Sequence, residues 1–537
     1  MRMSPHPAPA DVPAEATPER ASRRALVTAA VGGAGAAAVL PAVAPDRAEA
    51  ASYRPRRHRG TPLLGAADRH LVTRFSYGLT PGLTRAVRGA GGGRRWFERQ
   101  LQAGQTDAAT RALASWWPSL HYSPQKLWQR NIDEVEGGWE VMADYQRWLL
   151  LRRITTTRPV HELMTEFWMN HLNVPVHADA VFGYRFDYDR VVRARALGRF
   201  SELLKAAITH PAMGMYLSNA VSTKHHPNEN LGRELLELHT VGRGNHYDED
   251  DVKSSARILT GYRVDMWRTW EARYRPEDHW TGPVKVMGFE HRNADPDGRR
   301  VAEAYLDYLA HHPRTAQRIA RKLAVKFVRD DPPQALVDTL ARTYLRHDTA
   351  IVPVLRALVA SRAFKASAGD KVRDPVEDLV ATYRALGVRV TRPTRPVENP
   401  AAVAILWQSD SIGAVPHDWP RPDGAPIDND SWSSPARLLA SMDVHFTMSG
   451  RWWPNKGIAY REPVDWLPAP AVRFDVLVDH LCQQLLGRRS TSALLKACCQ
   501  AARVGPATRI DREHGVVKWE FPRVLSTILD SPAHLTR

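Results

Sequence analysis

Cysteine is scarce in this chain of 537 residues, which contains only three. Cys482, Cys498 and Cys499 form neither a Cys-x-x-Cys pair nor a mixed Cys/His zinc spacing, so the common cysteine-based metal modules are excluded. In an oxidising compartment Cys482 could bridge to Cys498 or to Cys499, which would leave one thiol over. The sequence does not decide whether either bridge forms.

The chain also lacks the short motifs of the common hydrolases and nucleotide-binding enzymes. It contains no Gly-x-Ser-x-Gly nucleophile elbow, no Gly-rich phosphate loop and no His-Glu-x-x-His metal motif. A recognised nucleic-acid-binding motif is missing as well, which disfavours nucleic acid as a partner. The sequence therefore specifies no reaction, and whether the protein is an enzyme stays open.

Long apolar runs are missing beyond the N-terminal region, so we expect no transmembrane segment in the mature chain. The first 50 residues have the pattern of an export signal. Ser22-Arg23-Arg24-Ala25-Leu26-Val27 opens a mild Ala/Gly/Val run, and Ala48-Glu49-Ala50 offers a cleavage site. The pattern predicts a twin-arginine signal over residues 1–50, cleavage near Ala50 and a secreted or extracytoplasmic location. An uncleaved membrane anchor is the alternative, which Pro41 and the glycines in the run weaken.

Basic residues outnumber acidic ones, with 74 Lys+Arg against 58 Asp+Glu and a formal net charge of +16. Such an excess favours anionic partners. Cell-envelope polymers, lipid headgroups, nucleic acid and acidic substrates are all anionic, and the charge does not choose among them. Partners consistent with the export signal are an anionic polymer of the cell envelope and another exported protein.

Hydrophobic periodicity predicts a mainly α fold: a large single-body multi-helix domain with long irregular loops and at most a short β-hairpin. The hairpin is expected within residues 267–298, which are rich in Trp, Tyr, Pro, Asp and Gly. The expected segments after the signal are a basic tether at 51–65, a main helical body at 66–386, a linker at 387–400 and a C-terminal helical part at 401–537.

The densest polar stretch runs from His225 to Gly242, and Asn228 and Gly242 suit the start and the end of a helix. His239 falls among the leucines of the apolar side. The opposite face carries an amide, an arginine and three carboxylates: Asn230, Arg233, Glu229, Glu234 and Glu237. A solvated, ion-paired surface and the wall of a site are both consistent with this face.

A second helix is expected over His161–His171, where His171 also falls on the apolar side, opposite Glu166. Burying either histidine without a partner would cost roughly 1–3 kcal/mol. We therefore expect His171 and His239 to approach within about 10 Å, close enough to share one partner, with a carboxylate nearby. They are either core residues that bond to backbone groups, or ligands and acid–base groups. The candidate site is Glu166, His171, Asn228, Asn230, Arg233, Glu234, Glu237 and His239, of which His171, His239, Glu166 and Glu234 are candidate ligands of a divalent metal.

A third helix, from Arg314 to Arg329, gathers cations on one face, opposite Ala316, Leu323 and Phe327. The face is either a solvated surface or a docking surface for something anionic. Its candidate anion-binding residues are Arg314, Arg318, Arg321, Lys322, Lys326 and Arg329.

Several of these blocks together resemble a known family. The resemblance spans about Ala66 to Arg537 and rests on blocks that include Met164–Val174, Asn228–Gly242, Lys371-Val372-Arg373-Asp374-Pro375 and Leu529-Asp530-Ser531-Pro532. They resemble the DUF1800 family of exported bacterial proteins, whose biochemical role is unassigned. The resemblance implies one large, mainly helical domain and commonly a twin-arginine signal, but no established catalytic residues. The family often has a second histidine where this chain has Met169, so a site that needs it would be absent or altered here.

We therefore expect a binding or assembly protein of the cell envelope. The alternative is a metal- or cofactor-assisted enzyme with a Glu/His site between the helices at 161–171 and 229–239.

The export signal makes the first testable prediction. Replacing Arg23 and Arg24 by lysine should leave the uncleaved precursor inside the cell, because the twin arginines are the feature that this route reads. Cell fractionation with N-terminal sequencing of the exported chain measures this. Lysine at Arg2 and Arg20 is the matched control, and unchanged export of the Arg23/Arg24 variant would contradict the prediction.

Overall fold

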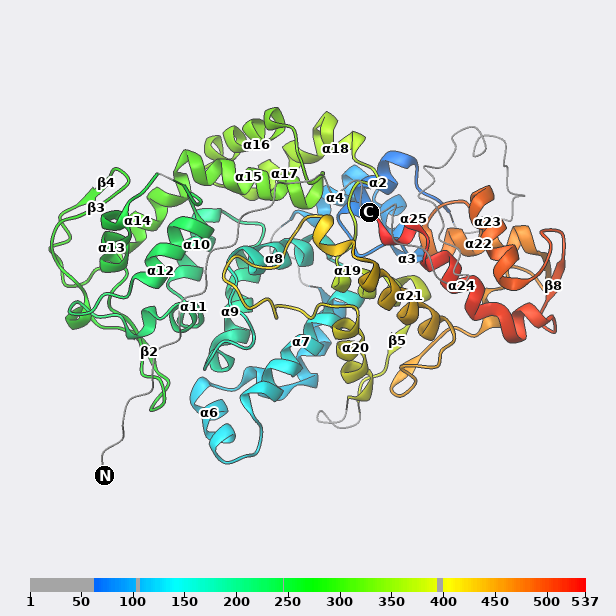
Figure 1. Cartoon of the computed structure of the whole chain (residues 1–537), viewed down its shortest axis with the longest axis horizontal. Coiled ribbons are helices and arrows are strands. Elements are labelled where there is room, and N and C mark those ends of the chain that lie inside the picture. The colour runs from blue at the N-terminus through cyan, green and yellow to red at the C-terminus, as the bar shows by residue number, and fades with distance from the viewer. Residues whose placement is uncertain (1–61, 103–106, 245, 394–398) are drawn as a thin grey trace, which may run out of the picture. The chain divides into compact units, whose positions relative to one another are not determined.

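The computed structural model describes residues 62–102, 107–244, 246–393 and 399–537. The predicted signal at 1–50 and most of the tether lie outside these residues. The described residues belong to one compact unit and are mainly helical (Figure 1), which confirms the predicted fold class. No described helix is long and apolar enough to cross a membrane.

The first half of the fold consists of helices of 4 to 18 residues joined by irregular loops. Its α-helices are α2 (Ala66–Arg74), α3 (Pro81–Gly89), α4 (Gly93–Gln100), α5 (Ala108–Arg111), α6 (Pro124–Ile132), α7 (Gly138–Thr155), α8 (Pro159–His171), α9 (Phe182–Arg195), α10 (Phe200–Ile208), α11 (Pro211–Tyr216), α12 (Glu229–Glu234) and α13 (Glu249–Ile258). A π-helical turn, Leu235–His239, continues α12.

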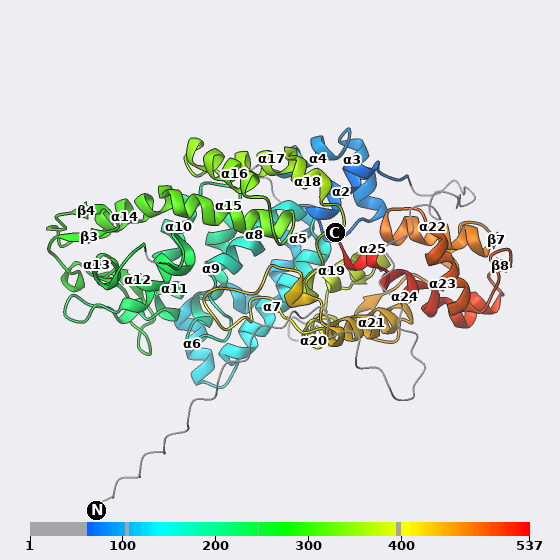
Figure 2. The ribbon, with the colours of Figure 1, turned by 45° about the horizontal axis from the view of Figure 1, so that its top comes forward.

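In the second half, α15 and α16 run side by side (Figures 1 and 2). Its α-helices are α14 (Arg299–His311), α15 (Pro313–Phe327), α16 (Gln334–Arg346), α17 (Ile351–Ala360), α18 (Arg362–Ala366), α19 (Pro375–Leu386), α20 (Pro400–Ser411), α21 (Pro435–Ser449), α22 (Phe474–Leu486), α23 (Ser492–Ala502), α24 (Phe521–Leu529) and α25 (Pro532–Leu535). A second π-helical turn, Val516–Glu520, precedes α24.

Local sequence chemistry sets many helix starts. Thr80, Ser123, Asp374 and Ser434 each accept a hydrogen bond from a backbone N–H of the first turn, and each is followed by a proline. The side chain satisfies an otherwise free donor, and proline at the first helical position gives up an N–H that would have no partner there.

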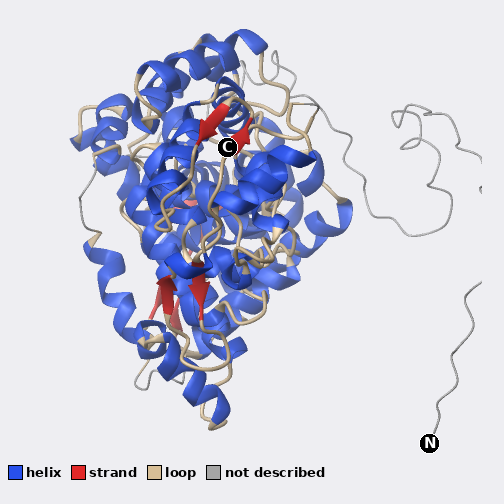
Figure 3. Ribbon diagram, turned by 90° about the vertical axis from the view of Figure 1, so that its left-hand side faces the viewer, coloured by secondary structure: helices blue, strands red, loops and turns tan. Residues whose placement is uncertain are grey.

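Four two-stranded antiparallel sheets interrupt the helices (Figure 3), where one short hairpin was expected. They are β1–β2 (Tyr262–Val264, Ala272–Tyr274), β3–β4 (Val284–Val286, Phe289–His291), β5–β6 (Arg389–Val390, Ile458–Ala459) and β7–β8 (Ala471–Arg473, Arg509–Asp511). The first two are local hairpins. The last two pair segments far apart in the sequence, which local patterns do not reveal.

Two hydrophobic clusters fill the interior of the described residues, and they do not divide at the predicted linker. The first draws mainly on 64–101 and 160–364, the second mainly on 113–154 and 376–529. Helix α7 packs against α19 and α20 (Figure 1), which ties an early segment to the C-terminal part. The start of the linker is strand β5, whereas residues 394–398 lie outside the described residues.

Helix α8 contributes to both clusters, with Met164, Phe167, Trp168 and Met169 in the first and Leu163 in the second. Met169 is fully buried, so the position where the resembled family often has histidine is a core position here.

The three cysteines are all free thiols, with Cys482 and Cys498 buried. Neither of the bridges left open by the sequence is present.

Candidate functional site

Two side-chain contacts join helix α8 to helix α15. Lys326 Nζ lies 3.5 Å from Glu166 Oε1, and Lys322 Nζ lies 3.1 Å from His171 Nδ1. Lys322 and Lys326 are about one turn apart and so share a face of α15. Arg74 holds the end of this helix, because its Nη1 donates to the backbone oxygen of Phe327 at 2.7 Å and that of Val328 at 3.0 Å.

Lys326 is buried between three carboxylates. Besides Glu166, its Nζ lies 2.9 Å from Glu377 Oε1 and 3.4 Å from Asp374 Oδ2. The prediction that Lys326 belongs to an exposed docking face is therefore wrong. Helical periodicity placed it on the cationic arc, but α8 and α19 cover that end of α15 and supply the opposite charges.

The three carboxylates are close enough together to hold a metal ion, since one ligand atom from each lies within 4.8 Å of the others. The Lys326 ammonium already contacts all three, and it supplies the positive charge that a metal would bring. Glu166 has two further partners, because Tyr77 donates to its Oε2 at 3.2 Å and Arg153 Nη1 lies 3.3 Å from the same atom.

The charges around this cluster shift the pKa values of Glu377 and Asp374 in opposite directions. Burial opposes ionisation of Glu377, but Arg537 and Lys326 outweigh burial and lower its pKa to about 2. Burial and the charge of Glu377 raise the pKa of Asp374 to about 6, although Lys326 opposes this. The same carboxylates outweigh burial at Lys326 and raise the pKa of its ammonium. Asp374 therefore keeps its proton to a higher pH than Glu377 does.

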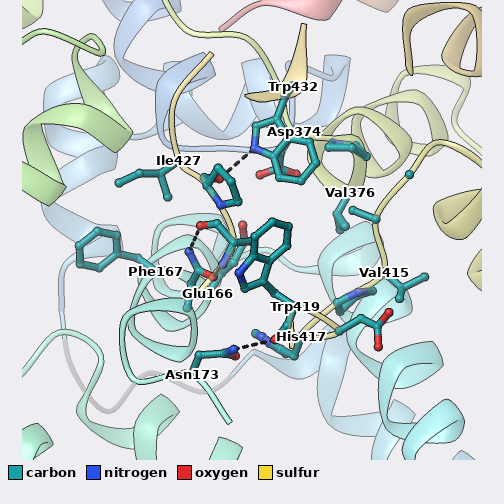
Figure 4. A pocket seen from close by; sticks show the side chains of 18 of the residues that line it. Glu166, Phe167, Asn173, Asp374, Val376, Val415, His417, Trp419, Ile427 and Trp432 are labelled. Atoms are coloured by element: carbon teal, nitrogen blue, oxygen red, sulfur yellow. Dashed lines mark hydrogen bonds between the residues drawn. The ribbon is translucent and has the colours of Figure 1, made fainter. Parts of the chain in front are cut away.

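A cavity of about 270 Å³ lies beside the cluster (Figure 4). Its walls include Trp419 and Trp432, and both Glu166 and Asp374 reach it. Aromatic walls with a few converging polar groups are typical of small-ligand sites.

A loop that covers the cavity is held in place by two asparagines near the end of α8. Asn170 Oδ1 accepts from the N–H of Ala425 at 2.6 Å, and its Nδ2 donates to the oxygen of the same residue at 2.8 Å. Asn173 Nδ2 donates to the backbone oxygen of Trp419 at 2.8 Å. Gly424 has φ +77°, and a Cβ there would lie 2.0 Å from the backbone oxygen of Asn170, so this position requires glycine.

His171 and His239 lie together as predicted, with ring centroids 6.1 Å apart. Nε2 of His171 lies 3.0 Å from the backbone oxygen of His239, and Nδ1 of His239 lies 3.0 Å from the backbone oxygen of His171. A carbonyl oxygen only accepts, so each of these nitrogens carries the hydrogen. Nδ1 of His171 is then free to accept from Lys322.

This histidine pair has the character of a core contact. Burial and then Lys322 hold the pKa of His171 well below its usual value, and burial lowers the pKa of His239 to about 3. Burial and then Arg318 lower the pKa of Lys322 to about 7. Both rings are neutral at neutral pH, each hydrogen-bonded to the backbone of the other helix.

The four predicted metal ligands are not gathered around one point. Glu166 faces Lys326 instead of the histidines. Within the described ranges, the groups of three or more ligands that share one coordination sphere are Glu166–Asp374–Glu377 and Asp378–His445–His534. Neither includes His171, His239 or Glu234, because the sequence gives the face of each helix but not which faces meet.

The polar face of α12 is an ion-paired surface. Asn228 caps the helix by accepting from the N–H of Asn230 at 3.0 Å, as its position predicts. Arg233 Nη2 lies 2.7 Å from Glu249 Oε2 and 3.5 Å from Glu229 Oε2.

The other two carboxylates of this face differ from each other. Glu237 pairs with Arg243 at 3.2 Å. Glu234 is half-buried, and burial followed by the charge of Glu237 raises its pKa. Glu229, Arg233 and Glu237 thus have the ion pairs of a solvated surface, whereas in the described residues Glu234 Oε2 has no hydrogen-bond partner.

A cationic groove of about 660 Å³ lies where the end of the α12 segment meets α15. All five charged residues that line it are basic: Arg243, Arg314, Arg318, Arg321 and Lys322. Gly242, with φ +92°, lets Arg318 pass close, since a Cβ there would lie 3.2 Å from Nη1 of that arginine. Four of the six predicted anion-binding residues therefore line one groove, while Lys326 is internal and Arg329 lies beyond the helix end.

Sequence reasoning missed Arg153, Asp374, Glu377 and the tryptophans of the cavity. Asp374 was visible within the Lys371–Pro375 block and Trp419 within a Pro/Asp/Gly-rich loop. Nothing in either segment indicated that both approach Glu166.

The carboxylate cluster predicts a large stability loss for Lys326→Met. Removing the ammonium takes one cation from three buried carboxylates, and breaking such a buried contact costs roughly 3–5 kcal/mol. Glu166 keeps Arg153 and Glu377 keeps Arg537, whereas Asp374 loses the ammonium beside it. The pKa of Asp374, already above its usual value, should then rise further, so lowering the pH from neutral should restore part of the loss. Denaturant unfolding at neutral and mildly acidic pH measures both effects.

Lys322→Met is the matched control for this experiment. Its amine has a pKa of about 7 and a histidine as partner, so its removal leaves no buried carboxylate unpaired. A loss for Lys326→Met no larger than for Lys322→Met would contradict the assigned role.

Comparison with known proteins places the chain in a family but not in a function. The DUF1800 family, described as a protein of unknown function, matches residues 70–536. No curated protein and no solved structure matches the chain. Because the family match covers most of the sequence, the chain belongs to the DUF1800 family.

Proposed function

We propose that this protein is an extracytoplasmic binding protein that holds an anionic polymer in the cationic groove on α15. The observation that carries the proposal is the lining of the groove, in which every charged residue is basic. The twin-arginine signal predicted from the sequence would bring the groove into contact with the anionic polymers of the cell envelope.

The arginines of the groove are held in place before any ligand binds. Arg318 Nε donates to the backbone oxygen of Leu238 at 3.1 Å, and Arg321 Nη2 donates to Gln334 Oε1 at 2.6 Å. Burial and the nearby charge of Arg243 lower the pKa of Arg318. An anion between these guanidinium groups would relieve their repulsion, and the fixed side chains would lose little freedom on binding.

An extended ligand fits the groove better than a compact one. The arginines of the groove on α15 run from Arg314 to Arg321, a rise of about 10 Å along the helix. Charges repeated along a polymer can meet several of these cations at once, and the net charge of +16 adds long-range attraction.

The groove predicts that Arg314→Glu combined with Arg321→Glu weakens binding. Each exposed charge contact is worth up to about 1 kcal/mol, so we expect about tenfold or more loss of affinity for labelled long-chain polyphosphate in fluorescence anisotropy. The affinity of the unaltered protein should fall as ionic strength rises.

Arg342→Glu combined with Arg346→Glu on α16 is the matched control, since it changes the net charge equally on exposed residues outside the groove. Equal losses for the two double variants would show that net charge, and not the groove, holds the polymer. Binding to anionic vesicles but not to polyphosphate would assign a membrane surface instead.

Catalysis in the aromatic-walled cavity is the second candidate function, favoured by the position of Asp374. A carboxyl with a pKa of about 6 beside a second carboxyl, Glu166, can act as a general acid near neutral pH. Indole rings such as those of Trp419 and Trp432 offer flat apolar faces to a ring-shaped substrate, such as a sugar.

This second candidate predicts slow hydrolysis of envelope polysaccharides, followed as release of reducing ends. Activity should fall above about pH 6, as Asp374 loses its proton. Asp374→Asn should remove most of the activity, and the fall above pH 6 with it, because an amide cannot donate the proton. The helix cap should be kept, because asparagine caps helices as well as aspartate. Absence of reducing ends, or an unchanged pH profile in the variant, would reject this candidate.

A further inference from the structure

Three potential metal ligands converge where α19 meets two helices of the C-terminal part, and none of them belongs to the carboxylate cluster or to the cationic groove. Asp378 lies on α19, His445 on α21 and His534 on α25, and all three are buried. One ligand atom from each lies within 4.8 Å of the others. The two imidazole rings are 5.3 Å apart at an interplanar angle of 80°.

The distances between the ligand atoms are those of a metal coordination sphere. Asp378 Oδ1 lies 3.4 Å from His445 Nε2 and 3.6 Å from His534 Nε2. Ligands about 2.0–2.1 Å from a tetrahedral ion are separated from each other by roughly 3.3–3.4 Å. In the part of the chain that the structure describes, neither Asp378 Oδ1 nor His445 Nε2 has a hydrogen-bond partner. Two unpartnered buried polar atoms that face each other point to an ion between them.

The surrounding side chains hold the ligands by their other atoms. His445 Nδ1 bonds to Asp530 Oδ1 at 2.8 Å, the carboxylate–histidine arrangement that orients metal-bound imidazoles. Asp378 Oδ2 accepts from Arg437 Nη2 at 3.0 Å and from the Ser441 hydroxyl, which leaves Oδ1 free.

Thr382 also contacts one of the three ligands. Its hydroxyl donates to the backbone oxygen of Asp378 at 3.0 Å, and its oxygen lies 3.0 Å from His534 Nε2. With the hydroxyl hydrogen directed to the carbonyl, His534 Nε2–H donates to the hydroxyl oxygen, so an ion bound at this nitrogen would displace that proton.

We infer that Asp378, His445 and His534 bind one divalent transition-metal ion. Two imidazoles and a carboxylate suit zinc or iron(II). The site is closed to solvent, with its ligands between fully buried and 4% exposed, and closed coordination is typical of a structural zinc. The ion would be taken up as the chain folds and would tie α19, α21 and α25 together.

A purely ionic cluster is the competing explanation, in which His445 is doubly protonated and pairs with both Asp378 and Asp530. That cluster accounts for the 2.8 Å contact to Asp530. It leaves the 3.4 Å contact between His445 and Asp378 without hydrogen-bond geometry. It also does not explain why His534 Nε2 lies 3.6 Å from the same carboxylate oxygen. The two explanations differ in metal content, which can be measured directly.

The test is elemental analysis of the full chain purified without added chelator. We expect about one equivalent of zinc or iron per chain, lost in His445→Ala and in His534→Ala. Asp530→Asn keeps all three ligands and should weaken retention during dialysis against a chelator by about 10- to 100-fold. Chain refolded with Co²⁺ should show the intense visible absorption of a tetrahedral site, which His534→Ala should abolish.

His171→Gln and His239→Gln are the matched controls, because they alter another buried histidine pair and should keep the metal. If the alanine variants fail to fold, the inference is still tested by the metal content and the cobalt spectrum of the unaltered protein. Metal retention in Asp530→Asn adds a second test. Absence of bound metal together with no cobalt spectrum would overturn the inference. So would metal that is retained in folded His445→Ala and His534→Ala.

Discussion

The buried contact of Lys326 with three carboxylates is the constraint on which the centre of this fold depends. One ammonium meets Glu166 of α8, Asp374 at the cap of α19 and Glu377 inside α19. Burial of each charge is tolerable only while the others are present. The cluster therefore fixes three helices relative to one another, and with them the floor of the aromatic cavity and the position of the cationic groove on the same helix.

Helix α19 connects the Lys326 cluster to the C-terminal part through two neighbouring residues. Glu377 and Asp378 are consecutive, so their side chains leave the helix about 100° apart and enter different surroundings. Glu377 faces Lys326, whereas Asp378 faces His445 and His534. A change at either residue should therefore affect both the cavity and the proposed metal site, although their ligands are separate.

Local sequence patterns predicted some features of the candidate site and not others. Helix starts such as Asn228 and the cationic arc of α15 were predictable, because capping chemistry and the 3.6-residue period act within a few residues. The approach of His171 to His239 was also predictable, since a buried ring needs a partner. Among the described residues, the rings hydrogen-bond to Lys322 and to two backbone carbonyls and not to the carboxylate that was expected beside them.

The sequence by itself determined the family, the mainly helical class, the start of α12 and the basic character of α15. These features follow from composition, from short motifs and from the 3.6-residue helical period, which act over a few residues. Only the tertiary structure decided that Lys326 is internal, that Asp374 and Glu377 meet Glu166, and that Asp378, His445 and His534 converge. These groups are separated by up to about 200 residues, and their meeting depends on which helix faces pack together. No local pattern encodes that choice, because it depends on the burial and charge of the whole interior at once.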